Sequence, residues 1–208
     1  KSVPRPRRWW DVSFADRASG SAATLQEELL SRLRDGVTSR MVADVPLGAF
    51  LSGGVDSSAV VALMAEASRQ AVRTCTIGFE EAGHDERSYA AQVAARFATD
   101  HRERVVRSDD FALIDTLVHA FDEPFADASA LPTWRVSQLA RETVKVALSG
   151  DGGDELFCGY RRYAPMPGVF PSPHERIRRY LAERLPVFGT ESLDGLFPEE
   201  SARFRADF

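Results

Sequence analysis

Apolar residues recur at helical spacing over positions 24–41, where Leu25, Leu29, Leu33 and Val37 stand four apart with charged residues between them. This pattern predicts an amphipathic helix. Because its apolar stripe needs a covering surface, we expect the helix to pack on a sheet.

Short apolar runs then alternate with longer segments of helical pattern. The runs predict strands at 45–51, 72–79, 104–106 and 144–148. The longer segments predict helices at 57–68, 86–97, 111–121 and 134–142, and a further helix opened by Asp154 and Glu155. Such alternation is typical of an α/β fold, a doubly wound parallel sheet with flanking helices.

Two glycine-rich turns follow predicted strands. Ser52-Gly53-Gly54 comes after the first strand, and the turn at 149–153 comes after the fourth. Ligands of open parallel sheets bind at the carboxyl ends of the strands, so we expect both turns to face one site.

The amino-acid composition changes after Tyr163. Four prolines fall within nine residues there, and a charged helix is expected over 174–185. We therefore place a domain boundary there, with one domain over 21–163 and the start of a helical extension over 164–208. The chain begins at Lys1 without a methionine, and we interpret it as a piece of a longer protein.

Composition narrows the class of protein. The chain has 208 residues, 44% of them hydrophobic, with a net charge of −5, which favours a packed core and speaks against a nucleic-acid-binding surface. No apolar run approaches a membrane span, so a soluble, cytoplasmic protein is the expectation. Cys75 and Cys158 lack metal-ligand spacing, and we interpret both as reduced core thiols.

The motif SGGVDSS at 52–58 has the features of a phosphate cradle. Gly53 and Gly54 let the backbone approach an anion, and the following helix presents unpaired N–H groups and its positive dipole end. Three hydroxyls can add donors: Ser52, Ser57 and Ser58. A tight turn with a helix cap is the plainer alternative.

Asp56 stands inside this cradle, where its negative charge would repel a phosphate unless a cation intervenes. It is therefore interpreted as a Mg²⁺ ligand. A Walker A loop does not fit, because Gly54 and Val55 occupy the positions that need Lys and Ser or Thr. The second turn adds Asp151, Asp154 and Glu155, which predicts a second Mg²⁺ ligand there.

These motifs resemble a known family. SGGVDSS resembles the PP-motif of ATP pyrophosphatases, and SGDGGDELFCGY at 149–160 is similar to the second signature of the asparagine synthase family's synthetase domain. TIGFE at 76–80 and FDEPFADASALP at 121–132 also fit that family. The resemblance covers roughly residues 9–163, and related PP-motif enzymes would share only the first motif.

The resemblance implies a PP-loop ATP pyrophosphatase fold, of the adenine nucleotide alpha hydrolase-like kind, that uses ATP and Mg²⁺. Mg²⁺ would be held by Asp56 and Asp154, with the phosphates on the 52–58 loop. A carboxylate would attack the α-phosphorus to give an acyl-adenylate, which ammonia converts to the amide. Adenine and ribose would lie near Phe50, Leu51, Ile77, Ser149 and Gly150.

The chain departs from the family at several points. Asp151 stands where asparagine synthetases have Glu, as a candidate proton-handling carboxylate. Around Asp127 those enzymes have an arginine for the aspartate substrate, and the segment 125–129 has none; an Asp there disfavours a simple anionic aspartate pocket. The family's glutaminase domain, which supplies ammonia, would precede a linker at 1–20, and its pyrophosphate-binding lysine has no counterpart here. The isolated chain is therefore expected to turn over little or not at all.

Two alternatives stay open at this point. One is a nucleotide-binding module of the same fold that binds ATP or AMP without chemistry, although two metal-binding carboxylates would have little use in it. The other is a β-lactam-synthetase-like enzyme, in which an internal amine replaces ammonia. Whether the chain forms a homo-oligomer is also open.

Overall fold

A computed structural model describes residues 7–10, 18–80, 85–106, 113–123, 125, 127–160, 172 and 175. The chain divides into two compact units, Lys1–Asp151 and Gly152–Phe208. The boundary expected after Tyr163 lies outside the described residues, as does nearly all of the helix expected over 174–185. The division at 163 therefore stays a prediction.

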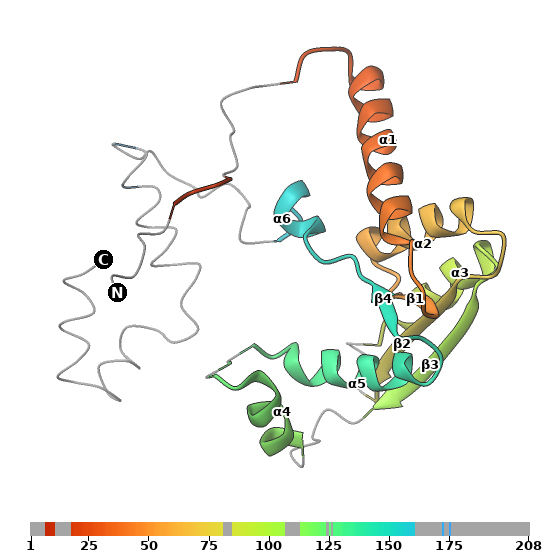
Figure 1. Cartoon of the computed structure of the whole chain (residues 1–208), viewed down its shortest axis with the longest axis vertical. Coiled ribbons are helices and arrows are strands. Elements are labelled where there is room, and N and C mark those ends of the chain that lie inside the picture. The colour runs from red at the N-terminus through yellow and green to blue at the C-terminus, as the bar shows by residue number, and fades with distance from the viewer. Residues whose placement is uncertain are drawn as a thin grey trace. The chain divides into compact units, whose positions relative to one another are not determined.

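The first unit is built on a four-stranded parallel sheet (Figure 1). Its strands stand in the order β3-β2-β1-β4. Their bounds are β1 Leu47–Phe50, β2 Arg73–Phe79, β3 Asp100–Val106 and β4 Val146–Leu148. The predicted parallel sheet is confirmed.

Helices connect these strands. In the first unit they are α1 Ala22–Arg40, α2 Val55–Ala67, α3 Arg87–Arg96, α4 Ile114–Phe121 and α5 Ala130–Arg141, and α6 Gly153–Phe157 belongs to the second unit. No helix in the described part of the chain is long and apolar enough to cross a membrane.

Hydrophobic residues are buried on both faces of the sheet. On one face, Ala49 and Leu51 of the β1 segment pack with α2 and α3, which contribute Val61 and Ala90. On the other face, Cys75 packs with a cluster from α5 and the turn after it. Helices therefore cover both faces, which confirms the doubly wound architecture.

Two predicted elements begin too late. β3 begins at Asp100 rather than Arg104, because its first residues are charged yet pair with β2 along a sheet edge, where polar side chains are tolerated. α5 begins at Ala130 rather than Trp134. Pro132 lies in its first turn, where the missing backbone N–H costs no helical hydrogen bond.

Two other expectations are wrong. α1 packs chiefly against α2 rather than on the sheet, with Val37 as its only buried residue among those described. Cys158 is exposed and not a core thiol. It follows the last residue of α6 as its C-cap, with a left-handed backbone of φ 58°.

Candidate functional site

The strand order reverses between β1 and β4. The chain passes from β1 to β2 and β3 on one side and then returns to place β4 on the other side of β1. Ala49 of β1 is in register with Leu148 of β4, so both strands point their carboxyl ends to the same edge. In doubly wound sheets the ligand crevice opens at this switch point, and both glycine turns begin there.

The first turn is shaped by its own hydroxyls. Ser52 Oγ and Ser57 Oγ share a hydrogen bond of 3.0 Å, and the Gly54 N–H donates to Ser52 Oγ at 3.2 Å. Ser57 Oγ also donates to the Gly54 carbonyl at 3.2 Å. Ser58 Oγ is buried and has no hydrogen-bond partner among the described residues. Ser52 and Ser57 thus rigidify the loop, a role that the sequence did not predict.

The amino end of α2 lies open at this turn. Gly54 occupies the N-cap position, and no side chain caps the helix. The first turn of α2 therefore keeps N–H groups for an anion, reinforced by the helix dipole. Asp56 lies in this same turn and is partly exposed. The open helix end is compatible with the predicted phosphate cradle, and the role of Asp56 as a Mg²⁺ ligand stays a prediction.

Gly53 is required by close packing against α3. Its φ is +85°, and a Cβ there would lie 2.5 Å from Tyr89 Cβ and 2.6 Å from the Ala90 nitrogen. The glycine therefore lets the loop rest directly on the first turn of α3. The sequence reasoning ascribed this glycine only to the approach of an anion.

The second turn lies directly on the first. A Cβ at Gly150 would lie 2.7 Å from the Ser57 nitrogen and 3.0 Å from the Asp56 carbonyl carbon. Ser149 Oγ donates to Asp151 Oδ2 at 2.9 Å. The structure thus brings Gly150 of the second turn against the first turn, while a shared site for both turns stays a prediction.

A cavity of about 230 Å³ opens beside the first turn. Four of the predicted nucleotide-binding residues line it: Phe50, Leu51, Ser52 and Ile77. Ser149 and Gly150 are not among its lining residues. The residues that sequence reasoning missed are Cys75, Thr76, Phe79, Glu86, Pro132, Thr133 and Val136.

A simple signal could have found part of this set. Cys75, Ile77 and Phe79 alternate along β2 and therefore share one face, as period-2 spacing in a strand requires. Pro132 and Thr133 gave no such signal, because the helix that contains them was expected to begin only at position 134. Burial raises the pKa of Cys75 to about 11, so this thiol is protonated at neutral pH.

Asp154 and Glu155 lie in the first turn of α6, in the second unit. Glu155 accepts a hydrogen bond of 2.6 Å from the Tyr160 hydroxyl. Gly159 lies so close to Asp154 that a Cβ there would meet its carboxylate. Within the described residues, no group of three or more His, Cys, Asp or Glu side chains is placed to hold a metal ion. The pairing of Asp56 with Asp154 stays a prediction.

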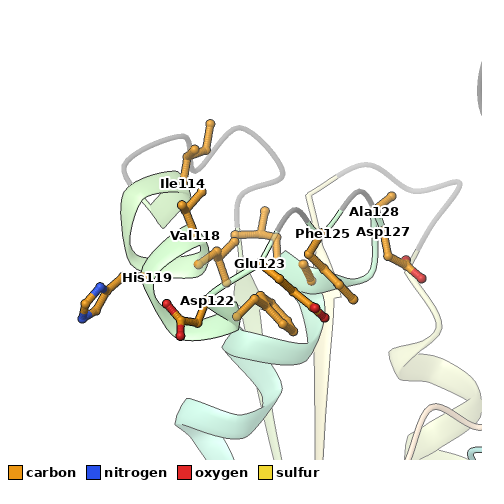
Figure 2. Close-up of a pocket in the computed structure, with 12 residues that line it drawn as sticks. Ile114, Val118, His119, Asp122, Glu123, Phe125, Asp127 and Ala128 are labelled. Carbon is orange, nitrogen blue, oxygen red and sulfur yellow. The ribbon is translucent and has the colours of Figure 1, made fainter. Parts of the chain in front are cut away.

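A second, larger cavity of about 930 Å³ lies between α4 and α5 (Figure 2). The rings of Phe121 and Phe125 stack in its wall with centroids 4.0 Å apart. Glu123 and Asp127 line the same cavity. Asp127 Oδ1 accepts a 2.8 Å hydrogen bond from the Ser129 N–H, which lowers the pKa of this carboxyl.

His101 of β3 is held by hydrogen bonds within the sheet. Its Nδ1 lies 2.9 Å from Thr74 Oγ1, which also bonds Thr99 Oγ1 at 2.8 Å. Burial lowers the pKa of His101. This chain of contacts joins β2 to β3 and does not reach either cavity's set of lining residues.

A doubly wound parallel sheet with an SGGVDSS loop at its switch point defines the class, an α/β domain of the PP-loop, adenine nucleotide alpha hydrolase-like kind. The family follows from the comparison of sequences. The family model "Asparagine synthase" matches residues 28–196, and the chain belongs to the asparagine synthase family.

Curated relatives agree with this family. The chain is 49% identical over 138 residues to "Putative asparagine synthetase [glutamine-hydrolyzing] 2" of Methanocaldococcus jannaschii, covering 65% of this chain and 27% of that protein. It is 36% identical over 162 residues to "Asparagine synthetase [glutamine-hydrolyzing] 1" of Bacillus subtilis, covering 77% of this chain and 25% of that protein. The chain thus spans about a quarter of the length of these relatives.

Among solved structures, the chain is similar to the NH3-dependent NAD synthetase from Campylobacter jejuni. The TM-score is 0.43 and the identity 14%, over 86% of this chain and 87% of that one.

Proposed function

We propose that this chain is the ATP-binding synthetase part of an asparagine-synthetase-like amidotransferase, in which it activates a carboxylate for amide formation. One observation carries the proposal. At the switch point, the uncapped first turn of α2 lies against Gly150 so closely that no side chain would fit between the two turns. A helix end with unpaired N–H groups, apposed to a second backbone turn, suits a polyphosphate.

The nucleotide would extend from this cradle into the neighbouring cavity. Phe50, Leu51 and Ile77 supply apolar wall for the base, and Ser52 stands where the cavity meets the phosphate loop. Gly150 lies against the start of α2, and Ser149 precedes it in the chain. The proposal thus uses every predicted nucleotide-binding residue, with the base in the cavity and the phosphates on the loop.

Mg²⁺ fits the donor set proposed for it. Mg²⁺ prefers oxygen ligands and commonly takes one or two carboxylates together with substrate phosphates. Asp56 in the first turn of α2 would be one ligand, and Asp154 in the first turn of α6 the other. When bound, the ion would neutralise charge that develops on the departing pyrophosphate.

The proposed reaction makes a carboxylate into an electrophile. Its oxygen attacks the α-phosphorus of ATP and releases pyrophosphate, leaving an acyl-adenylate from which ammonia displaces AMP. Asp151 is the candidate proton-handling group, and its carboxylate accepts a hydrogen bond from Ser149. N–H groups of the loops stabilise negative charge on the phosphates.

The substrates and partners belong to the same proposal. Relatives are named glutamine-hydrolysing, so ammonia from a glutaminase domain outside this chain is the proposed nitrogen source. The acceptor is aspartate or a related acid. Glu123 and Asp127 line the α4–α5 cavity, and we place them on the acceptor side.

The rival function is nucleotide binding without chemistry, and metal dependence separates the two. A β-lactam-forming variant would share the ATP site and differ only in the nucleophile. Substitution of Asp56 tests the site directly. We expect Asp56→Asn to lower the gain in ATP affinity that Mg²⁺ provides by about tenfold, because one charged ligand is lost.

The matched control is Asp35→Asn, which removes an equal charge from the exposed surface of α1. Isothermal calorimetry at several Mg²⁺ concentrations measures both variants, and urea unfolding checks that each is folded. An unchanged Mg²⁺ effect in Asp56→Asn would remove Asp56 from the metal site.

A further inference from the structure

One carboxylate in the nucleotide cavity has no role in the function proposed above. Glu86 is the single charged residue among the described residues that line the cavity. The rest of the lining is apolar or carries a neutral hydroxyl or thiol. An anion in a site for a polyphosphate is unfavourable by charge repulsion, unless it receives a hydrogen bond from the ligand.

The backbone around Glu86 is held on both sides. Asp85 and Arg87 form a bidentate pair, in which Arg87 Nε and Nη2 donate to the Asp85 carboxylate at 2.8 and 2.7 Å. Arg87 Nη1 also lies 3.7 Å from Glu103 Oε1 of β3. The pairing lowers the pKa of Asp85, so its carboxylate stays charged. This clamp ties the segment before α3 to the sheet.

The Glu86 side chain itself is left out of these contacts. Its carbonyl accepts from the N–H groups of Tyr89 and Ala90 at 3.0 and 3.1 Å, which opens α3. Although Glu86 occupies the N-cap position, its carboxylate makes no capping hydrogen bond. The same turn of α3 contacts Gly53 of the phosphate loop. A fixed backbone thus presents an uncommitted carboxylate at the cavity, next to the phosphate end.

We propose that Glu86 is a specificity-determining residue that accepts a hydrogen bond from the nucleoside half of ATP; this inference rests on the proposed function. A carboxylate can only accept hydrogen bonds. The nucleoside of ATP offers two kinds of donor, the exocyclic amine of adenine and the ribose hydroxyls. Both would satisfy Glu86, and analogues that lack one donor at a time distinguish them.

The test measures dissociation constants of the Mg²⁺ complexes of four nucleotides by calorimetry. They are ATP, 2′-deoxy-ATP, 3′-deoxy-ATP and purine riboside triphosphate, which lacks the exocyclic amine. We expect the wild-type chain to bind at least one analogue about tenfold more weakly than ATP. In Glu86→Ala, ATP should weaken by about the same factor, and the discrimination against that analogue should disappear.

Two further variants sharpen the result. Glu27→Ala removes a carboxylate from the exposed surface of α1, which does not line the cavity. It should leave all four dissociation constants unchanged. Arg87→Gln breaks the clamp but keeps Glu86, and it should reduce the discrimination without abolishing ATP binding. Because Glu86 is exposed and makes no cap bond, Glu86→Ala should retain the wild-type urea midpoint.

Each outcome decides the matter. If Glu86→Ala binds ATP as tightly as wild type or more tightly, with the analogue ratios unchanged, Glu86 only repels the phosphates and the inference is overturned. That result leaves the proposed function standing, because ATP still binds. If the wild-type chain binds none of the four nucleotides, both the inference and the proposed function fail for this chain.

Discussion

At the scale of single residues, Gly53 and Gly54 are adjacent in the loop but restricted differently. Gly53 has φ +85° and no room for a Cβ beside Tyr89, whereas Gly54 has φ −66° and a Cβ there would lie 3.3 Å from Ser52 Oγ. The loop therefore depends on one glycine for its packing and much less on the other.

Gly53→Ala should lower the free energy of unfolding by about 2 kcal/mol or more, since it adds backbone strain to an overlap with α3. Gly54→Ala is the matched control and should change that free energy by less than about 1 kcal/mol. Urea denaturation measures both. Equal effects would mean that the contact between the loop and α3 is not what restricts Gly53.

The buried thiol of Cys75 links stability to alkaline pH. Its pKa rises from an ordinary value of 9.0 to about 11 on burial. Between these values the unfolded chain releases a proton that the folded chain keeps, so this contribution to stability is full below pH 9 and falls as pH rises toward 11.

When the pH is raised from about 8 to about 10, the free energy of unfolding should therefore fall less in Cys75→Ala than in wild type. The expected difference is on the order of 1 kcal/mol. Urea midpoints at the two pH values provide the measurement. Cys158→Ala, which removes the exposed thiol, should behave as wild type does. The burial argument fails if Cys75→Ala and wild type have the same pH dependence.

At the scale of elements, β3 is joined to β2 by the polar chain Thr99, Thr74 and His101 as well as by the backbone. Burial lowers the pKa of His101, while nearby Glu103 opposes that shift in part. The folded chain thus keeps His101 neutral at pH values where the unfolded chain begins to protonate it.

Stability should consequently fall as pH drops below 6.5, the ordinary pKa, toward the lowered folded value. His101→Gln should lack this part of the fall in stability at acid pH. His119→Gln, on the exposed surface of α4, should keep it. Thermal unfolding followed from neutral to mildly acid pH gives the comparison. An acid loss of wild-type size in His101→Gln would exclude His101 as its source.

The elements also show what hydrophobic patterning can predict. The apolar run around β1 and the mixed run of apolar residues and threonines in β2 identified these two largely buried strands, and α2 followed from its many Ala, Val and Leu residues. β3 was truncated in the prediction because an edge strand tolerates charge and thus loses the apolar signal. α1 was placed on the wrong partner, since periodicity identifies a buried stripe and not its neighbour.

At the scale of the whole molecule, the candidate site depends on the order of the strands. The sequence predicted both glycine turns at strand ends, and the switch between β1 and β4 brings Gly150 onto the first turn of α2. Glu86 and the α5 residues enter the cavity only through tertiary packing, which no local pattern encodes. Ser52 and Ser57 were predicted as phosphate donors, yet in the fold they bond to each other.

In the proposed function, the switch-point cradle binds ATP together with Mg²⁺. Calorimetric titration of the chain with ATP, with and without Mg²⁺, tests it most directly. The account predicts that Mg²⁺ increases the affinity for ATP by about tenfold or more, because the ion joins the phosphates to Asp56. ATP affinity that is the same with and without Mg²⁺ would contradict the account and favour a binding module without ligase chemistry.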